Sequence, residues 1–265
     1  MVPDDDGRGG AGLYIDGVPS SHLDLADPRR LDFEYMRWIG DVIDSYAPDG
    51  APLRAVDVDG AACTLPRYVE ATRPGSRQVV FEVDGEVLAT VKREFGLRSG
   101  PRMRLRLVDG RAGLAGLEPA SQDLLVRDAF AVSSAVGAEV PGHLVTDGFL
   151  DEVRRVLSPG GLYVANLADR PPLRQARAEA ATARTVFAQV ALIAEPAQFK
   201  GRRHGNLVLL ASDGPLPEAP LARRLASGAV RARYMTPAEV RGFASGAVVH
   251  RDPTGPHSWQ QAPNG

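Results

Sequence analysis

Residues 53–84 read LRAVDVDGAACTLPRYVEATRPGSRQVVFEVD, and this stretch decides the fold class. The apolar run 53–59 predicts a short buried strand, and the run 78–84 predicts a second one. Between them, residues 65–75 have the apolar spacing of a helix and end at Pro74-Gly75, a pair that stops helices. A strand, a helix and a strand in this order predict a βαβ unit with two parallel strands.

The alternation continues along the chain. A tight hairpin is expected over 13–25 around Asp16-Gly17, followed by a helix over 33–46. Further strands are expected at 103–109, 123–130 and 162–169, and helices at 85–97, 149–161 and 173–187, the second of these ending at Pro159-Gly160-Gly161.

The last two expected strands, 189–195 and 206–213, are joined by a segment without a helical pattern. A parallel crossover normally needs a helix, so this pair is expected to be antiparallel. The chain is therefore predicted to be an α/β protein with a doubly wound, mostly parallel sheet that ends in an antiparallel strand pair. That arrangement is typical of class I methyltransferase-like Rossmann folds, and here it is preceded by a small N-terminal β-hairpin.

Length and composition are consistent with one α/β domain. The 265 residues, 44% of them hydrophobic, suffice for one large core. We expect disordered tails at 1–10 and 251–265, a hairpin and first helix over 11–50, and the methyltransferase-like domain over 51–250.

The charge balance argues against two classes of partner. Lys and Arg number 31 and Asp and Glu 33, so neither nucleic acid nor a membrane surface is expected to bind. Cys63 is the only cysteine, which excludes an intrachain disulfide and a thiolate metal cluster, and no metal site is predicted. Without an apolar leader or a membrane-length apolar run, the protein is expected to be soluble and cytoplasmic.

Acidic residues follow consecutive predicted strands. Because ligands of such sheets lie over the carboxyl ends of the strands, these side chains are candidates for binding an adenosine cofactor. An acid after the second strand can accept hydrogen bonds from ribose hydroxyls, and one after the third from the adenine amino group. The alternative for each is that it caps the following helix. The residues are Asp57, Asp59, Glu82, Asp84, Asp109 and Asp128.

Several runs resemble the spermidine synthase (polyamine aminopropyltransferase) family. The segment 15–44 resembles its N-terminal hairpin and first helix, and 57–95 resembles its cofactor segment in actinobacterial members with a GGGA-type loop before TLPRY. VDGRAGLA (108–115) and the run from 124 to 169 resemble later parts of the family domain. The resemblance implies transfer of an aminopropyl group from decarboxylated S-adenosylmethionine to a small-molecule amine such as putrescine, with a homodimer as a candidate assembly.

The resemblance also implies roles for individual residues. Asp128 matches the catalytic aspartate, which orients and helps deprotonate the attacking amine. The positions that match cofactor-binding residues are Asp59, Gly60 and Ala61 of the glycine loop, Glu82 for the ribose, and Asp109 with Gly110 for the adenine.

Two departures leave alternatives open. One glycine remains in the loop, where Asp59 and Ala61 flank Gly60, and Ala131 stands where the family usually has a second aspartate. Acid in the loop disfavours the carboxylate of ordinary S-adenosylmethionine and favours the decarboxylated form. The alternatives are a methyltransferase that uses S-adenosylmethionine on a small molecule, and a non-catalytic relative that acts as a binding protein.

Three side chains outside the matched motifs receive provisional interpretations. Tyr35 is expected to be a packing group with a polar tip. His22 and His143 are candidates for the mouth of the substrate site, although a loop or capping role is the more common one for a single histidine.

Overall fold

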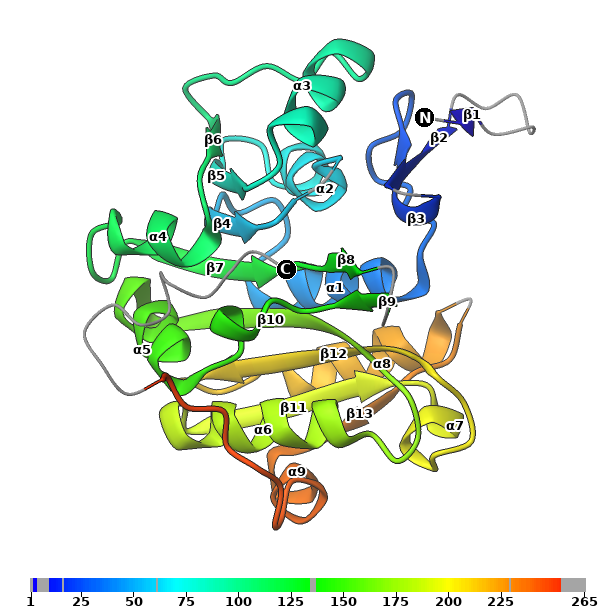
Figure 1. Ribbon diagram of the computed structural model, residues 1–265, viewed down its shortest axis with the longest axis vertical. Helices are drawn as coiled ribbons and strands as arrows, with labels where there is room; N and C mark the ends of the chain where they lie inside the picture. Colours follow the sequence, from blue (N-terminus) through cyan, green and yellow to red (C-terminus); the bar gives the residue numbers. More distant parts are fainter. Residues whose placement is uncertain are drawn as a thin grey trace.

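The computed structural model describes residues 2–3, 10–15, 17–60, 62–133, 137–228 and 230–253 (Figure 1). In chain order its elements are β1 Val2–Pro3, β2 Gly10–Ile15, β3 Val18–Asp24, α1 Glu34–Tyr46, β4 Arg54–Val58, α2 Thr64–Thr72, β5 Arg77–Glu82, α3 Gly85–Glu94, β6 Met103–Leu107, α4 Gly110–Ala115, β7 Gln122–Arg127, β8 Ala131–Ser133, β9 Gly137–Glu139, the 3-10 helix η1 Gly142–Leu144, α5 Asp147–Val156, β10 Leu157–Asp169, α6 Arg174–Val186, β11 Gln189–Ala194, α7 Pro196–Phe199, β12 Gly205–Ser212, α8 Glu218–Ser227, β13 Arg233–Met235 and α9 Pro237–Phe243.

The central sheet confirms the predicted fold class. Within the described residues its order is β13-β11-β12-β10-β7-β4-β5-β6. The strands from β10 to β6 are mutually parallel, and β12 runs antiparallel to both β10 and β11. The antiparallel relation predicted for the last two long strands, β11 and β12, is therefore confirmed. This is the arrangement of class I methyltransferase-like folds.

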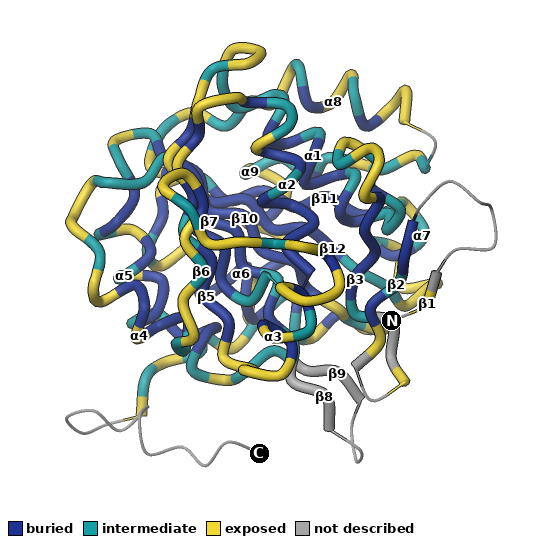
Figure 2. Tube along the Cα trace, turned by 90° about the horizontal axis from the view of Figure 1, so that it is seen from above, coloured by how far each residue is buried: buried dark blue, intermediate teal, exposed yellow. Residues whose placement is uncertain are grey.

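Helices cover both faces of the sheet, and the strands between them are buried (Figure 2). On one face, α1, α2 and α8 pack on side chains such as Ala55 and Val126. On the other face, α4, α5, α6 and α9 pack on side chains such as Val56 and Val58. Alternate residues of β4 thus point to opposite faces, as the pleat of a strand requires. Asp57 therefore shares the face of Ala55, beneath α1 and α2.

The N-terminal strands form a separate small sheet beside the main one (Figure 1). The predicted hairpin is present as β2 and β3, although Asp16 lies outside the described residues. Leu13 and Leu23 of this hairpin pack on Val87 of α3 and on Phe95, which follows that helix. The hairpin is also tied to the start of α2, because the Thr64 hydroxyl donates to the His22 carbonyl oxygen at 2.8 Å.

The structure corrects one predicted helix. Instead of 149–161, helix α5 ends at Val156, and Leu157 already pairs with β7. The Pro159-Gly160-Gly161 run lies inside β10, where the register with β7 shifts between Leu157 and Leu162. Gly160 has a φ of +76°, which suits glycine, so this run forms an irregularity in the strand and not a helix stop.

The connection between β11 and β12 contains a short helix that the pattern did not reveal. Helix α7 has only four residues, too few for an apolar periodicity, yet it has a capping box between Glu195 and Gln198. The strand β13 and the helices α8 and α9 were likewise not predicted.

Parts of the predicted tails belong to described structure. Val2–Pro3 pairs with β2, and residues 251–253 lie against the start of α5. There Asp252 forms a two-pronged ion pair with Arg111, with Nη1–Oδ1 and Nη2–Oδ2 distances of 2.7 and 2.5 Å. The remaining tail residues lie outside the described ranges.

Strand β6 is one edge of the main sheet and carries exposed charge. Arg104 and Arg106 are exposed, while Met103 on the opposite side of the strand is buried. None of the described helices is long and apolar enough to cross a membrane.

Candidate active site

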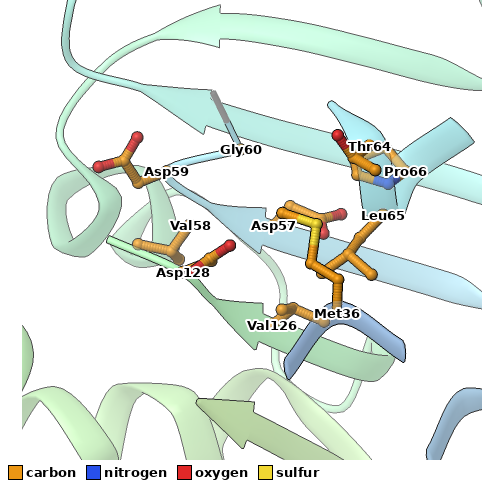
Figure 3. A pocket seen from close by; sticks show the side chains of 10 residues that line it. All are labelled: Met36, Asp57, Val58, Asp59, Gly60, Thr64, Leu65, Pro66, Val126 and Asp128. Carbon is orange, nitrogen blue, oxygen red and sulfur yellow. The ribbon is translucent and has the colours of Figure 1, made fainter. Parts of the chain in front are cut away.

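A pocket lies over the carboxyl ends of β4 and β7, between the first turn of α2 and helix α1 (Figure 3). The free space between these walls, counted together with open solvent at the mouth, is about 230 Å³. Its walls combine carboxyl groups with apolar side chains. They are formed by Met36, Asp57, Val58, Asp59, Gly60, Thr64, Leu65, Pro66, Val126 and Asp128.

Asp128 is held in the pocket by two side chains from other elements. The Tyr35 hydroxyl of α1 donates to Oδ2 at 3.1 Å, and the Asn166 amide of β10 donates to Oδ1 at 2.7 Å. Asn206 of β12 donates in turn to the Asn166 amide oxygen at 3.1 Å. Burial raises the pKa of Asp128 to about 6, even though these two hydrogen bonds act to lower it. Asp128 is therefore a fixed carboxylate that can accept a proton near neutral pH.

Asp57 is buried in the same pocket without a partner. Its side chain is 6% exposed and accepts no hydrogen bond from any residue that the structure describes. In Figure 3 it points from β4 toward Leu65 and Met36. Burial, followed by repulsion from Asp128, raises the pKa of Asp57 to about 8. Because Asp57 lines the pocket, water or a ligand there can supply the hydrogen-bond donors that its carboxyl group needs.

The glycine loop begins with a strained residue. Asp59 has a φ of +61°, in the left-handed region that aspartate tolerates better than most side chains. Its carboxyl group lies beside the Glu82 carboxyl and near the Phe130 backbone N–H. Burial and the neighbouring Glu82 raise the pKa of Asp59 well above its usual range.

The two matched glycines are required by close packing. A Cβ on Gly60 would lie 2.7 Å from Val80 Cγ1 of β5, and a Cβ on Gly110 would collide with Val58 Cγ1 of β4. Both positions therefore keep the loops close to the strand ends, where a nucleoside would lie. This observation fits an adenosine ligand at this edge of the sheet.

Helix capping accounts for some of the predicted acids. Asp84 caps α3 through the backbone N–H groups of Glu86 and Val87, at 2.7 and 3.1 Å. Asp109 caps α4 through Oδ1, while its Oδ2 lies 2.7 Å from His143 Nε2. The capping alternative thus holds for both, and His143 lies against the acid that was assigned to adenine.

Glu82 has a different environment. It is 4% exposed, and its Oε1 accepts a hydrogen bond from the Asp84 backbone N–H at 2.8 Å. The Asp59 carboxyl group lies beside it, so the assigned ribose acid and the glycine loop are neighbours. The structure therefore unites Asp59, Gly60, Glu82 and Asp128 around one edge, whereas Ala61 lies outside the described residues.

Two residues at the site were missed by sequence reasoning. Tyr35 was expected to be a packing group, yet its hydroxyl binds Asp128. Asn166 was not singled out, although an amide inside the apolar run 162–169 was a usable signal, because buried polar groups require partners.

His22, a candidate for the mouth of the substrate site, does not line the pocket. Its Nε2 lies 3.2 Å from Asp32 Oδ2.

Comparison with solved structures decides the family. A structure described as a probable spermidine synthase from Corynebacterium glutamicum ATCC 13032 is 38% identical to this chain, with a TM-score of 0.86 over 96% of this chain and 92% of that one. The chain belongs to the spermidine synthase family. The match includes nearly the whole of this chain and is not confined to the hairpin, the glycine loop and the strand ends.

Two further comparisons give lower sequence identity. The polyamine aminopropyltransferase of Vibrio vulnificus (strain CMCP6) is 26% identical over 203 residues. The match covers 76% of this chain and 64% of the Vibrio protein. Human methyltransferase-like protein 13, solved with SAH, shares the fold at 19% identity and a TM-score of 0.57, over 84% of this chain and 93% of that one. No protein-family model matches the chain.

Proposed function

We propose that this protein transfers an aminopropyl group from decarboxylated S-adenosylmethionine to a small amine acceptor such as putrescine. The observation that carries the proposal is Asp128, a buried carboxylate whose two oxygens accept hydrogen bonds from Tyr35 and Asn166. It lies in the pocket at the carboxyl ends of the parallel strands, where nucleosides bind in such sheets. The family's fold and the Vibrio aminopropyltransferase similarity support the same reaction class.

The chemistry fits the environment of Asp128. The acceptor nitrogen attacks the methylene carbon beside the sulfonium, and the carbon–sulfur bond breaks. The electron pair of that bond stays on sulfur, so that neutral methylthioadenosine is released. The attacking amine must lose a proton, and Asp128 accepts it, since a pKa of about 6 makes it largely ionised at neutral pH. Fixing the carboxylate in advance supplies part of the rate through orientation.

The nucleoside would lie on the strand ends that the packed glycines keep accessible. Glu82, beside Asp59, would accept hydrogen bonds from the ribose hydroxyls, and Asp109 with Gly110 would lie beside the adenine. The positions of Asp59, Gly60 and Ala61 would place the loop against the sulfonium end.

Two other functions have specific support. Methyl transfer from S-adenosylmethionine is favoured by the fold shared with a human methyltransferase solved with SAH. A non-catalytic binding role is favoured by Asp59, whose carboxyl group lies beside Glu82, the assigned ribose acid.

One assay separates these functions. The protein is incubated with putrescine and either decarboxylated or ordinary S-adenosylmethionine, and the products are identified by mass spectrometry. Aminopropyl transfer gives spermidine and methylthioadenosine, methyl transfer gives S-adenosylhomocysteine, and a binding protein gives neither. We expect the first outcome, with Asp128→Asn lowering kcat by about 10²- to 10⁴-fold while donor affinity stays nearly unchanged. The exposed Asp151→Asn is the matched control, and an equal rate for Asp128→Asn would remove Asp128 from the mechanism.

A further inference from the structure

Asp57 and Asp128 bring two buried carboxyl groups into one pocket. Asp57 pairs with Val126 in the sheet register, and Asp128 follows two residues later, so both emerge at the same end of adjacent strands. In Figure 3 the Asp128 side chain points toward Asp57, whereas Asp59 points away from both. Asp57 is more than nine-tenths buried, lines the pocket and lacks a hydrogen-bond partner among the described residues.

We propose that Asp57, together with Asp128, binds a primary alkylammonium group of a ligand and thereby selects cationic substrates that lack a carboxylate. The inference deepens the proposed function and rests on it for the identity of the ligand. An ammonium supplies what Asp57 lacks, namely hydrogen-bond donors and a positive charge.

The groups around Asp57 favour this ligand class. Helix α1 presents Met36, and the first turn of α2 presents Thr64, Leu65 and Pro66, none of which is charged. The charged group that acts on Asp57 is Asp128 from β7, and the nearby Cys63 thiol is neutral because burial raises its pKa. A carboxylate of ordinary S-adenosylmethionine would meet the ionised Asp128 here, so the pocket disfavours it.

Binding of a cation should also move a proton. Because the pKa of Asp57 is about 8, its carboxyl group is mostly protonated at pH 7 without ligand. An ammonium beside it favours the ionised form and lowers that pKa. Binding at pH 7 is therefore expected to release up to about one proton per ligand.

Calorimetric titrations test the proposal with three probes. Putrescine is titrated alone, because it requires no nucleoside site, and again with saturating methylthioadenosine. Decarboxylated S-adenosylmethionine and methylthioadenosine are titrated separately, because only the first carries an ammonium. Each titration uses the wild type, Asp57→Asn and the exposed Asp151→Asn, and wild-type titrations are repeated in two buffers of different ionisation enthalpy to count released protons.

We expect Asp57→Asn to lower the affinity for an ammonium ligand at least tenfold and to change the affinity for methylthioadenosine less than twofold. Loss confined to decarboxylated S-adenosylmethionine assigns the ammonium to the donor, and loss confined to putrescine assigns it to the acceptor. Unchanged affinity for both, or no binding of either to the wild type, overturns the proposal.

The proposed function can fail separately. Binding of putrescine that depends on Asp57, without binding of either nucleoside, would reject aminopropyl transfer and keep the ammonium site. If Asp57→Asn does not fold, proton release by the wild type decides, and binding without proton release at pH 7 counts against Asp57.

Discussion

Asp57 also links the site to stability. Its pKa is raised from the ordinary 3.8 to about 8, so the folded state holds a proton that the unfolded state releases. The stabilising contribution of that proton is complete below pH 4 and is lost as the pH rises through about 8. Asp57→Asn keeps the shape of the neutral acid and removes the titration.

We therefore predict that the unfolding midpoint temperature falls less steeply between pH 5 and pH 8.5 in Asp57→Asn than in the wild type. Thermal unfolding followed by circular dichroism measures it, with Asp151→Asn expected to follow the wild type. An equal dependence of the midpoint temperature on pH in Asp57→Asn and the wild type would contradict the raised pKa of Asp57.

At the residue scale, the strand-end rule named Asp57, Asp59 and Asp128, which line the pocket, but it did not predict how they are held. The contact between Tyr35 and Asp128 spans 93 residues, and that between Asn166 and Asp128 spans 38. Such contacts depend on how α1 and β10 lie against β7, which local periodicity does not encode.

At the scale of elements, one buried arginine joins two helices. Arg73, at the end of α2, donates from Nη2 to the carbonyl oxygens of Ile43 and Ala47, at 2.6 and 3.1 Å. Its Nη1 donates to those of Pro48 and Ala51, at 2.9 and 3.1 Å. Helix α1 has no basic residue in its own last turn, so Arg73 supplies the positive charge that its C-terminus favours.

Replacing this side chain should be costly. We predict that Arg73→Met lowers the free energy of unfolding by about 3–5 kcal/mol, because buried carbonyl groups lose their donors. Urea unfolding measures the change, and the exposed Arg77→Met serves as the control, with an expected effect within about 0.5 kcal/mol. A loss below 1 kcal/mol for Arg73→Met would show that water replaces the guanidinium.

Element prediction succeeded where a pattern was long enough to read. The repeating strands and helices from 53 to 187 gave the parallel sheet, because each buried face imposes its own period. It failed at Pro159-Gly160-Gly161, whose residues serve equally as a helix stop or a strand irregularity. It also failed for α7, which has four residues.

At the scale of the whole molecule, the segment after α9 returns to the sheet edge that carries Asp109. The backbone N–H of Asp147 donates to the His250 carbonyl oxygen at 2.9 Å, and Asp252 is ion-paired with Arg111 in the first turn of α4. The Arg111 hydrogen bond lowers the pKa of Asp252. Its contribution to stability is therefore present above pH 4 and lost as the pH falls further.

We predict that Asp252→Asn costs about 1–3 kcal/mol at pH 7 and that the difference from the wild type shrinks toward pH 3. Asp213→Asn removes the more exposed partner of Arg154 and should cost less than about 1 kcal/mol. Denaturant unfolding at both pH values measures these effects, and equal costs for the two variants would contradict a special role for the Arg111 pair.

The exposed arginines of β6 have a consequence beyond the folded monomer. As the last strand of the sheet, β6 pairs with a strand on one side only, and the Ser99 hydroxyl and the Gly100 N–H bind its Leu105 N–H and Met103 carbonyl oxygen. Arg104 and Arg106 place like charges along this short strand, so a second copy that added its own β6 would bring four guanidinium groups together. Self-association by strand addition is thereby opposed, which protects the protein from aggregation at high concentration.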